Sequence, residues 1–223
     1  MKYDHCGNFA AMHFRHLFAL LRPEHWVKNL FLFIPAFFAA RLAEPVILTN
    51  ACLRFVAFSL IASAVYVLND LVDAPQDRNH PDKQNRPIAS RAIGLRQAMA
   101  ILIVLLMGGA ALAASLNPYL LIICILYFMI NVGYSFWLKH IALIDVSLIG
   151  LGFLLRVFAG GVVTGVAVSQ WLIVLTFLLA LILGLAKRRG EYVIMTGGHS
   201  FRKSLEGYNL PFLDVGMVVC STV

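Results

Sequence analysis

Long apolar segments separated by short polar ones constrain the fold of this chain more than any other feature. Of its 223 residues, 61% are hydrophobic and only 13% are charged, whereas about a quarter are charged in an ordinary soluble domain. A helix of about 20 mainly apolar residues crosses a bilayer. We therefore predict an all-α fold, a polytopic membrane helical bundle. The predicted spans cover residues 30–41 with their N-terminal flank, 51–71, 95–115, 118–137, 141–163 and 170–186, and a seventh begins at Pro211.

The basic residues predict how this bundle is oriented. The formal charge is +7, but the cations gather in the N-terminal segment and in every second loop, while the other loops hold only Arg41 and Arg54. Cytoplasmic loops of membrane proteins carry the excess of Lys and Arg. We expect a multi-pass protein of the inner or plasma membrane, with its N-terminus and active site cytoplasmic and no nucleic-acid partner. Targeting would come from the first span, because the N-terminus lacks a cleavable signal peptide.

The four cysteines are scattered and show no metal-ligand spacing. Three of them lie in or near apolar segments, where a free cysteine behaves as a small hydrophobic residue. We expect packing roles for them and no disulfide framework.

A run of acidic residues closes the second predicted span. Asn69, Asp70, Asp73 and Asp77 offer oxygen ligands of the kind that Mg²⁺ prefers. Ionised groups at membrane depth are costly and mark functional sites by default. An unbroken helix would place Asp70, Asp73, Asp77 and Tyr66 on one face.

Pro75 interrupts this run. Proline removes a backbone donor and disfavours helix at the preceding residue. We therefore expect a kink or helix end there, with Asp77 on the following loop.

Cations near the membrane boundary could bind phosphate oxygens. Lys28 stands at the mouth of the first span, Arg78, Lys83 and Arg86 follow the acidic run, and Lys139 lies in a short turn. For each of them, a role only in orienting the chain is the competing interpretation.

Arg156 lies deep within the fifth predicted span. An arginine there faces the bundle interior and an anionic partner. That partner could be a substrate phosphate, or Asp145 about three turns earlier on a similar face.

The acidic run, Asn69-Asp70-x-x-Asp73-x-x-x-Asp77, resembles the first aspartate-rich motif of the UbiA-type intramembrane prenyltransferases. The resemblance implies an all-helical bundle, usually of nine spans, in which two such motifs bind Mg²⁺ and a diphosphate at the cytoplasmic side. It also implies that residues 1–223 are a single UbiA-like transmembrane domain that ends about three helices early. The second motif is normally a pair of aspartates, and here only Glu191 stands among Lys187, Arg188 and Arg189.

Further segments resemble the decaprenyl-phosphate phosphoribosyltransferase branch of this family. They are Arg22-Pro-x-x-Trp26-Val27-Lys28-Asn29, His80-Pro81-x-Lys83-x-x-Arg86-Pro87-Ile88-Ala89, Leu138-Lys139-His140, Leu155-Arg156-x-x-Ala159-Gly160-Gly161 and Ala186-Lys187-Arg188. The branch implies Mg²⁺-dependent transfer of 5-phosphoribose from 5-phosphoribosyl 1-diphosphate to a polyprenyl phosphate such as decaprenyl phosphate, a cell-wall precursor. The partners would be the lipid bilayer, the two substrates and, in a homo-oligomer, further copies of the chain.

The same resemblance distributes roles among the candidate residues. Asn69 and Asp73 would hold Mg²⁺ on the leaving diphosphate, assisted by Asp70 and Asp77. Tyr66 and Lys28 would position the donor. The 5-phosphate of the donor and the phosphate of the lipid would be bound by Lys83, Arg86, Lys139, Arg156, Lys187 and Arg188.

Two alternatives stay open. One is prenyl transfer from a polyprenyl diphosphate to an aromatic acceptor, using the same metal site. The other, of a different class, is a membrane transporter whose charged residues bind ions or substrate within the spans. The acidic run lies at one membrane face and beside cations, which favours the transferases.

Overall fold

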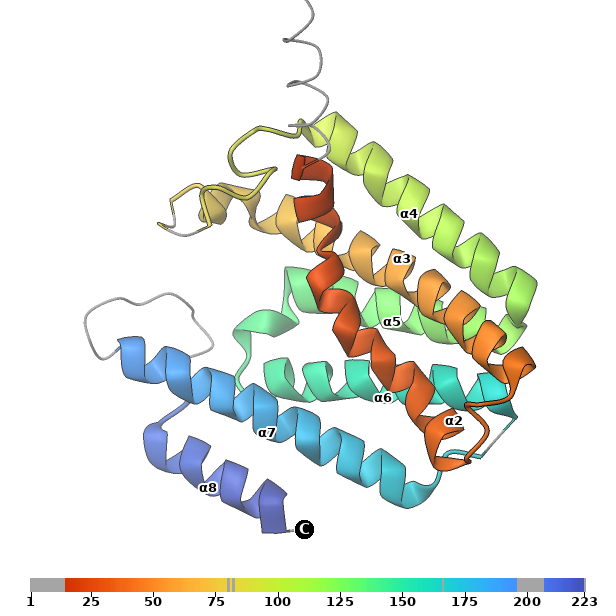
Figure 1. The fold of residues 1–223 in the computed structure, drawn as a ribbon. Coiled ribbons are helices and arrows are strands. Elements are labelled where there is room, and N and C mark those ends of the chain that lie inside the picture. Colours follow the sequence, from red (N-terminus) through yellow and green to blue (C-terminus); the bar gives the residue numbers. More distant parts are fainter. Residues whose placement is uncertain (1–14, 80, 82, 166, 196–206, 223) are drawn as a thin grey trace, which may run out of the picture. The chain divides into compact units, whose positions relative to one another are not determined.

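The computed structural model is built from helices. It describes residues 15–79, 81, 83–165, 167–195 and 207–222, and within those ranges there is no β-strand. Residues 15–21 are helical and are followed by the 3₁₀-helix η1 (Pro23–Phe33) and the short α2 (Ile34–Phe38). The longer helices are α3 (Pro45–Asp77), α4 (Leu95–Leu116), α5 (Pro118–Phe136), α6 (Ile144–Thr164) and α7 (Gln170–Met195), with η2 (Leu138–His140) before α6 and α8 (Leu210–Thr222) after α7 (Figure 1).

Five helices are long and apolar enough to cross a membrane: α3, α4, α5, α6 and α7. This confirms the predicted class, an all-α membrane protein. The expected first span is different, since η1 and α2 replace one long α-helix. Pro35 lies at the start of α2 and has no N–H for an α-helical bond to the preceding turn. The apolar segment that begins near Pro211 forms the shorter helix α8.

The chain divides into two compact units. The first contains Met1–Leu30 and Leu53–Phe128, and the second contains Phe31–Cys52 and Met129–Val223. α3 and α5 contribute to both units.

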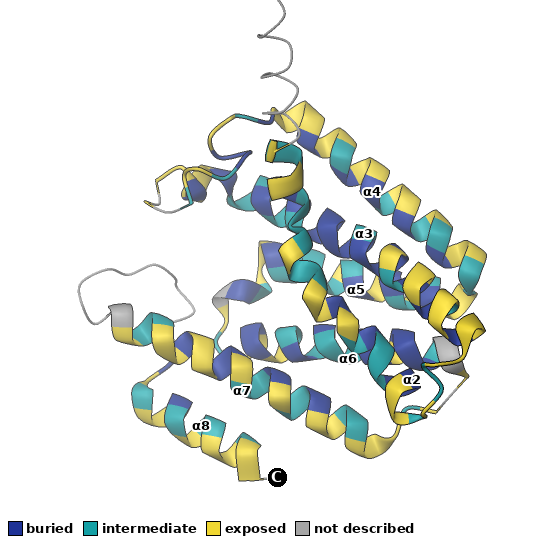
Figure 2. Ribbon diagram, in the orientation of Figure 1, coloured by how far each residue is buried: buried dark blue, intermediate teal, exposed yellow. Residues whose placement is uncertain are grey.

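In the first unit, α3 and α4 run side by side (Figure 1). Their contact is close at Gly109, where an added Cβ would lie 2.9 Å from the Ile61 side chain and 3.1 Å from the Ala57 carbonyl oxygen. α4 buries one stripe of small and aliphatic residues and exposes Met99, Ile103 and Met107 on its other side (Figure 2). This apolar exposed stripe is what a helix facing lipid requires.

In the second unit, α7 packs against both α6 and α8, and α2 packs against α6. A Cβ on Gly160 of α6 would overlap the backbone carbonyl of Leu32. Only glycine permits this approach, which gives a physical reason for the Ala159-Gly160-Gly161 segment. The helix ends at Gly165, which has a φ of 63°.

The helix end expected at Pro75 does not form, since α3 continues through it to Asp77. Proline costs one hydrogen bond here, to the carbonyl four residues earlier, and little helix follows. The preceding residue, Ala74, is buried in the apolar core of the first unit with Val67 and Ile88. Packing therefore holds the last turn helical, and Asp77 is its final residue instead of a loop residue.

Candidate functional site

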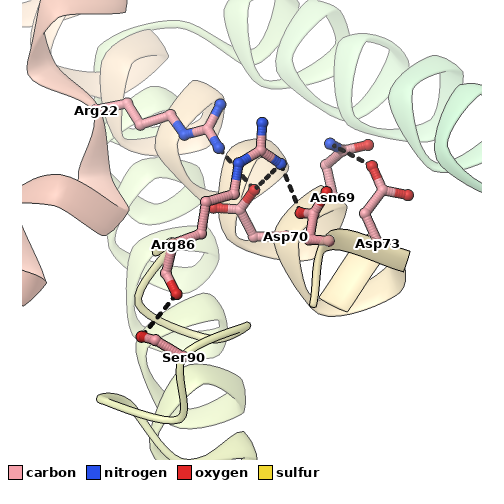
Figure 3. A network of polar contacts seen from close by, with 7 residues as sticks. Arg22, Asn69, Asp70, Asp73, Arg86 and Ser90 are labelled. Carbon is pink, nitrogen blue, oxygen red and sulfur yellow. Dashed lines mark hydrogen bonds and ion pairs between the residues drawn. The ribbon is translucent and has the colours of Figure 1, made fainter. Parts of the chain in front are cut away.

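The acidic run lies on the last three turns of α3, within the first unit. Asp70 and Asp77 are buried, with exposed fractions of 2% and 4%, and Asn69 and Asp73 are half-buried. The structure therefore brings the predicted polar residues together at one end of an apolar helix. It also divides them into two groups, which point to different partners (Figure 3).

Asp70 and Asp77 form the first group, together with two arginines. The Asp70 Oδ1 atom accepts hydrogen bonds from Arg22 Nη2 at 2.7 Å and from Arg86 Nη1 at 3.2 Å. Arg86 Nη1 also donates to Asp77 Oδ2 at 2.7 Å. One guanidinium thus bridges two carboxylates that lie two helical turns apart.

Asn69 and Asp73 form the second group. The Asn69 Nδ2 atom donates to Asp73 Oδ2 at 3.1 Å, across one turn of α3. This hydrogen bond orients the Asp73 carboxylate.

Side-chain oxygen atoms at the end of α3 fit Mg²⁺. Mg²⁺ is commonly held by one or two carboxylates while substrate phosphates and water complete its coordination. Asn69 and Asp73 offer such oxygens, and Asp70 adds a buried Oδ2 atom with no hydrogen-bond partner among the described residues. Among those residues no cluster of three or more His, Cys, Asp or Glu side chains could hold a metal ion. The four expected ligands are therefore divided, because Asp77 and one oxygen of Asp70 bind arginines.

Arg22 belongs to the site, and the sequence did not single it out as a functional residue. It has a left-handed φ of 51° and connects the helix of residues 15–21 to η1. Its guanidinium lies 5.5 Å from the centre of the Tyr66 ring, which His25 contacts at a ring distance of 5.1 Å. The Arg22-Pro-x-x-Trp26 segment was the available signal. Hydrogen bonds from Trp26 to Ser63 (3.0 Å) and from Asn29 to Ser59 (2.8 Å) then fix η1 along α3.

The other candidate cations of the first unit lie on η1 and on the loop that follows α3. Lys28 is exposed on η1, and Lys83 is half-buried in the loop that carries Arg86. Arg78 is exposed and its Nε donates to the Ala89 carbonyl at 3.3 Å, so that it shapes the same loop.

The second unit holds the other expected phosphate ligands. Lys139 of η2 and Arg156 of α6 are buried, and Lys187 of α7 is exposed. Arg156 Nη1 donates to the Gly152 carbonyl at 2.7 Å, and its guanidinium lies 5.6 Å from the centre of the Phe153 ring.

Asp145 does not serve as the counterion considered for Arg156. Its Oδ2 accepts from Arg188 Nε at 2.7 Å and its Oδ1 accepts from the Tyr208 hydroxyl at 2.7 Å. Arg188 also donates to Glu191 at 2.5 Å. Helix geometry explains the difference, since Asp145 lies in the first turn of α6, where the long Arg188 side chain reaches it from α7.

This arrangement changes the expectation for Arg188. Its side chain is 2% exposed, and two of its nitrogens bind carboxylates. The Tyr208 hydroxyl completes the network by accepting from the Leu143 backbone N–H at 2.7 Å. Burial, and then the hydrogen bond to Asp145, raise the pKa of Tyr208 above its ordinary value. Arg188 therefore connects α6, α7 and the segment before α8.

Comparison with known proteins identifies the family. The model of the UbiA prenyltransferase family matches residues 30–188. The chain belongs to that family. It is 35% identical over 199 residues to a decaprenyl-phosphate phosphoribosyltransferase of Mycobacterium tuberculosis, a match that covers 86% of this chain and 66% of the relative. The corresponding protein of Corynebacterium glutamicum is 34% identical over 209 residues, covering 91% and 62%.

More distant members match in part or in fold. A digeranylgeranylglyceryl phosphate synthase of Sulfurisphaera tokodaii is 33% identical over 109 residues, which cover 49% of this chain and 38% of the relative. Among solved structures, a UbiA homologue from Archaeoglobus fulgidus bound to GPP and Mg²⁺ matches with a TM-score of 0.75 at 21% identity, covering 93% of this chain and 73% of that one. The chain thus has the UbiA fold and spans about two thirds of the length of the phosphoribosyltransferases it resembles.

Proposed function

We propose that this chain performs the Mg²⁺-dependent transfer of 5-phosphoribose from 5-phosphoribosyl 1-diphosphate to a polyprenyl phosphate, with release of diphosphate. The observation that carries the proposal is identity of 34–35% over 86–91% of the chain with relatives named decaprenyl-phosphate phosphoribosyltransferase. The match to a digeranylgeranylglyceryl phosphate synthase covers only half of the chain.

The charges of the candidate residues support this assignment. The donor carries a diphosphate and a 5-phosphate, and the acceptor is itself a phosphate. A prenyl transfer to an uncharged acceptor has one diphosphate to bind. In the second unit, Lys139 and Arg156 are buried cations, and they add to the positive charge that could bind these further phosphates.

In the proposed reaction, the bond between ribose C1 and the diphosphate oxygen breaks, and an oxygen of the lipid phosphate bonds to C1. Negative charge accumulates on the leaving diphosphate. Asn69 and Asp73 would hold Mg²⁺, which would shield that charge. The acceptor is already an anion, so the reaction needs no strong general base.

The paired carboxylates of α3 have a different task in this proposal. Asp70 and Asp77 fix the position of Arg86, and Asp70 also fixes Arg22. Cations held in advance at the site of developing charge stabilise a transition state without reorganising. Asp70 and Asp77 would thus position cations, while Asp73 would touch the metal.

The active site would face the cytoplasm of the inner or plasma membrane. The loop that follows α3 contains Arg78, Lys83, Arg86 and Arg91, and Arg96 lies in the first turn of α4. Positively charged loops stay on the cytoplasmic side.

Donor discrimination tests the proposal. Purified protein with Mg²⁺ would be given either 5-phosphoribosyl 1-diphosphate with decaprenyl phosphate, or a polyprenyl diphosphate with a phenolic acceptor. We expect diphosphate release and a phosphoribosylated lipid in the first mixture only. Consumption of the prenyl donor alone would replace this proposal with UbiA-type prenyl transfer.

A further inference from the structure

Arg54 is a buried arginine that the aspartate site does not use. It lies on α3 within the first unit, and its residue is 6% exposed. Its Nε and Nη1 atoms are buried and have no hydrogen-bond partner among the described residues. A guanidinium stays charged at any physiological pH, and a buried charge without a partner is strongly destabilising. An anion that binds there would remove this cost.

Among the residues of the first unit that the structure describes, no acidic side chain lies near Arg54. Asp70 is sixteen residues further along α3, which corresponds to about 24 Å of helix, and Asp73 and Asp77 lie beyond it. Glu24 lies on η1 between Arg22 and Trp26, whose hydrogen bonds reach α3 at Asp70 and Ser63. Among the described residues of this unit, the acidic groups therefore gather at the other end of α3.

The helices that pack around Arg54 are apolar. α4 approaches α3 at Gly109, beside Ala57 and Ile61, and the Tyr127 ring of α5 lies 4.8 Å from the Phe58 ring. These contacts bring α4 and α5 along the segment of α3 that carries Arg54. Neither helix contains an Asp or a Glu. Neither α4 nor α5 therefore supplies an acidic partner for Arg54.

The position of Arg54 along the membrane indicates the class of the missing anion. The hydrocarbon core of a bilayer is about 30 Å thick. Asp77, the last residue of α3, is twenty-three residues from Arg54, which corresponds to about 34 Å of helix. With Asp77 at one boundary of the hydrocarbon core, Arg54 therefore lies close to the other boundary, next to the lipid headgroups. Its neighbours Leu53 and Val56 are 40% and 47% exposed, so the acyl chains of a lipid could run along α3 while its headgroup reaches the arginine.

We propose that Arg54 binds the phosphate group of a membrane lipid at the membrane face opposite the aspartate cluster. The interaction joins a guanidinium to phosphate oxygens, a pairing that is stronger than a neutral hydrogen bond. The site is separate from that of the proposed transfer reaction, and its test does not depend on activity.

Thermal stability in defined lipid provides the test. The chain would be purified in detergent and heated with phosphatidylglycerol, with a diacylglycerol that has the same acyl chains but no phosphate, or with inorganic phosphate. We expect phosphatidylglycerol to raise Tm by about 5 °C, a shift typical of saturating ligand on a protein of this size. The other two additions should raise it by less than about 1 °C.

The decisive variant is Arg54→Met, which replaces the buried charge with an apolar side chain of similar length. Without lipid it should be at least as stable as the wild type, because the unpaired charge is gone. Its response to phosphatidylglycerol should disappear. Arg41→Met is the matched control, since Arg41 is exposed and binds Glu44, and it should respond as the wild type does.

Several results would overturn the proposal. An unchanged phosphatidylglycerol response in Arg54→Met would mean that lipid binds elsewhere, and an equal response to diacylglycerol would mean that acyl chains suffice. An equal response to inorganic phosphate would assign the site to a soluble anion. A changed oligomeric state in Arg54→Met would assign the partner to another copy of the chain. If Arg54→Met does not fold, native mass spectrometry of Arg54→Lys decides, because a point charge should retain less phosphatidylglycerol than the wild type.

Discussion

The guanidinium of Arg188 lies 2.7 Å from the carboxylate of Asp145, and the two side chains are 2% and 0% exposed. This ion pair joins α7 to α6 in the second unit. From the sequence, Arg188 was a candidate ligand of a substrate phosphate, and Asp145 was a candidate partner of Arg156. In the structure, these two residues bind each other. Of the cations that the sequence proposes as phosphate ligands in this unit, Lys139, Arg156 and Lys187 are then the ones not bound to Asp145.

We predict that Asp145→Asn destabilises the protein strongly. Removing one partner of a buried ion pair leaves the other charge uncompensated, at a cost of about 3–5 kcal/mol. Thermal denaturation in a fixed detergent would show a Tm lowered by roughly 10 °C. The double variant Asp145→Leu with Arg188→Met should recover most of this loss, because it removes both charges together.

The exposed pair between Arg189 and Asp214 is the control for this prediction. Its side chains are 46% and 49% exposed, and exposed pairs contribute about 0–1 kcal/mol. Asp214→Asn should thus change Tm little. Equal effects of Asp145→Asn and Asp214→Asn would contradict the structural role of the buried pair.

Tyr208 leads to a prediction about alkaline pH. Burial raises the pKa of its hydroxyl, as does the hydrogen bond to Asp145, so the folded state favours the neutral form. This contribution to stability is complete below the ordinary tyrosine pKa of about 10 and decreases as the pH rises above it. Tyr208→Phe should lower stability at pH 7 by about 1–2 kcal/mol, and the difference from wild type should shrink above pH 10. A constant difference between pH 7 and pH 11 would argue against this coupling.

The sequence predicts features made by residues close together in the chain better than contacts between residues far apart in it. Periodic apolar segments are local, so the helical class and the bounds of α4 and α5 were predicted closely. The acidic run was also recognisable, because its members lie within three turns. The partners were not, since Arg22 and Arg86 reach Asp70 across 48 and 16 residues of sequence. Spacing on one helix shows which residues share a face, but not which charged side chains from other segments bind them.

The same limit explains Pro75 and Arg188. Local preference favoured a helix end at Pro75, whereas packing around Ala74 maintains the helix. A basic residue beside Glu191 was compatible with phosphate binding, and only the fold brings Asp145 to it. Tyr208 carried no local signal at all, because its partners Leu143 and Asp145 lie 65 and 63 residues earlier.

Asp70 and Asp73 should respond differently to loss of charge. Asp73→Asn keeps the size of a half-buried side chain but removes the charge that is proposed to hold Mg²⁺, so we expect a roughly tenfold higher Mg²⁺ requirement with little change in Tm. Asp70→Asn leaves Arg22 and Arg86 with less counter-charge in a buried position and should lower Tm by several degrees. Transfer rates over a Mg²⁺ titration, together with Tm for both variants, would separate the roles.

EDTA should abolish the activity of the wild type, and full activity in excess EDTA would reject the metal altogether.

Arg156 is the residue for which structural and functional roles can be separated most sharply. It is 4% exposed, and its Nη1 atom binds the Gly152 carbonyl of its own helix. A lysine can stay charged there but cannot reproduce the planar fork with which arginine binds phosphate. We therefore predict that Arg156→Lys folds normally and loses at least about 90% of its transfer rate, mainly through weaker transition-state binding. Arg189→Lys is the control, because Arg189 is exposed and pairs with Asp214, and it should retain activity. Equal activity of both variants would remove Arg156 from the proposed phosphate ligands, and a lower Tm with an unchanged rate would make it a structural residue of α6.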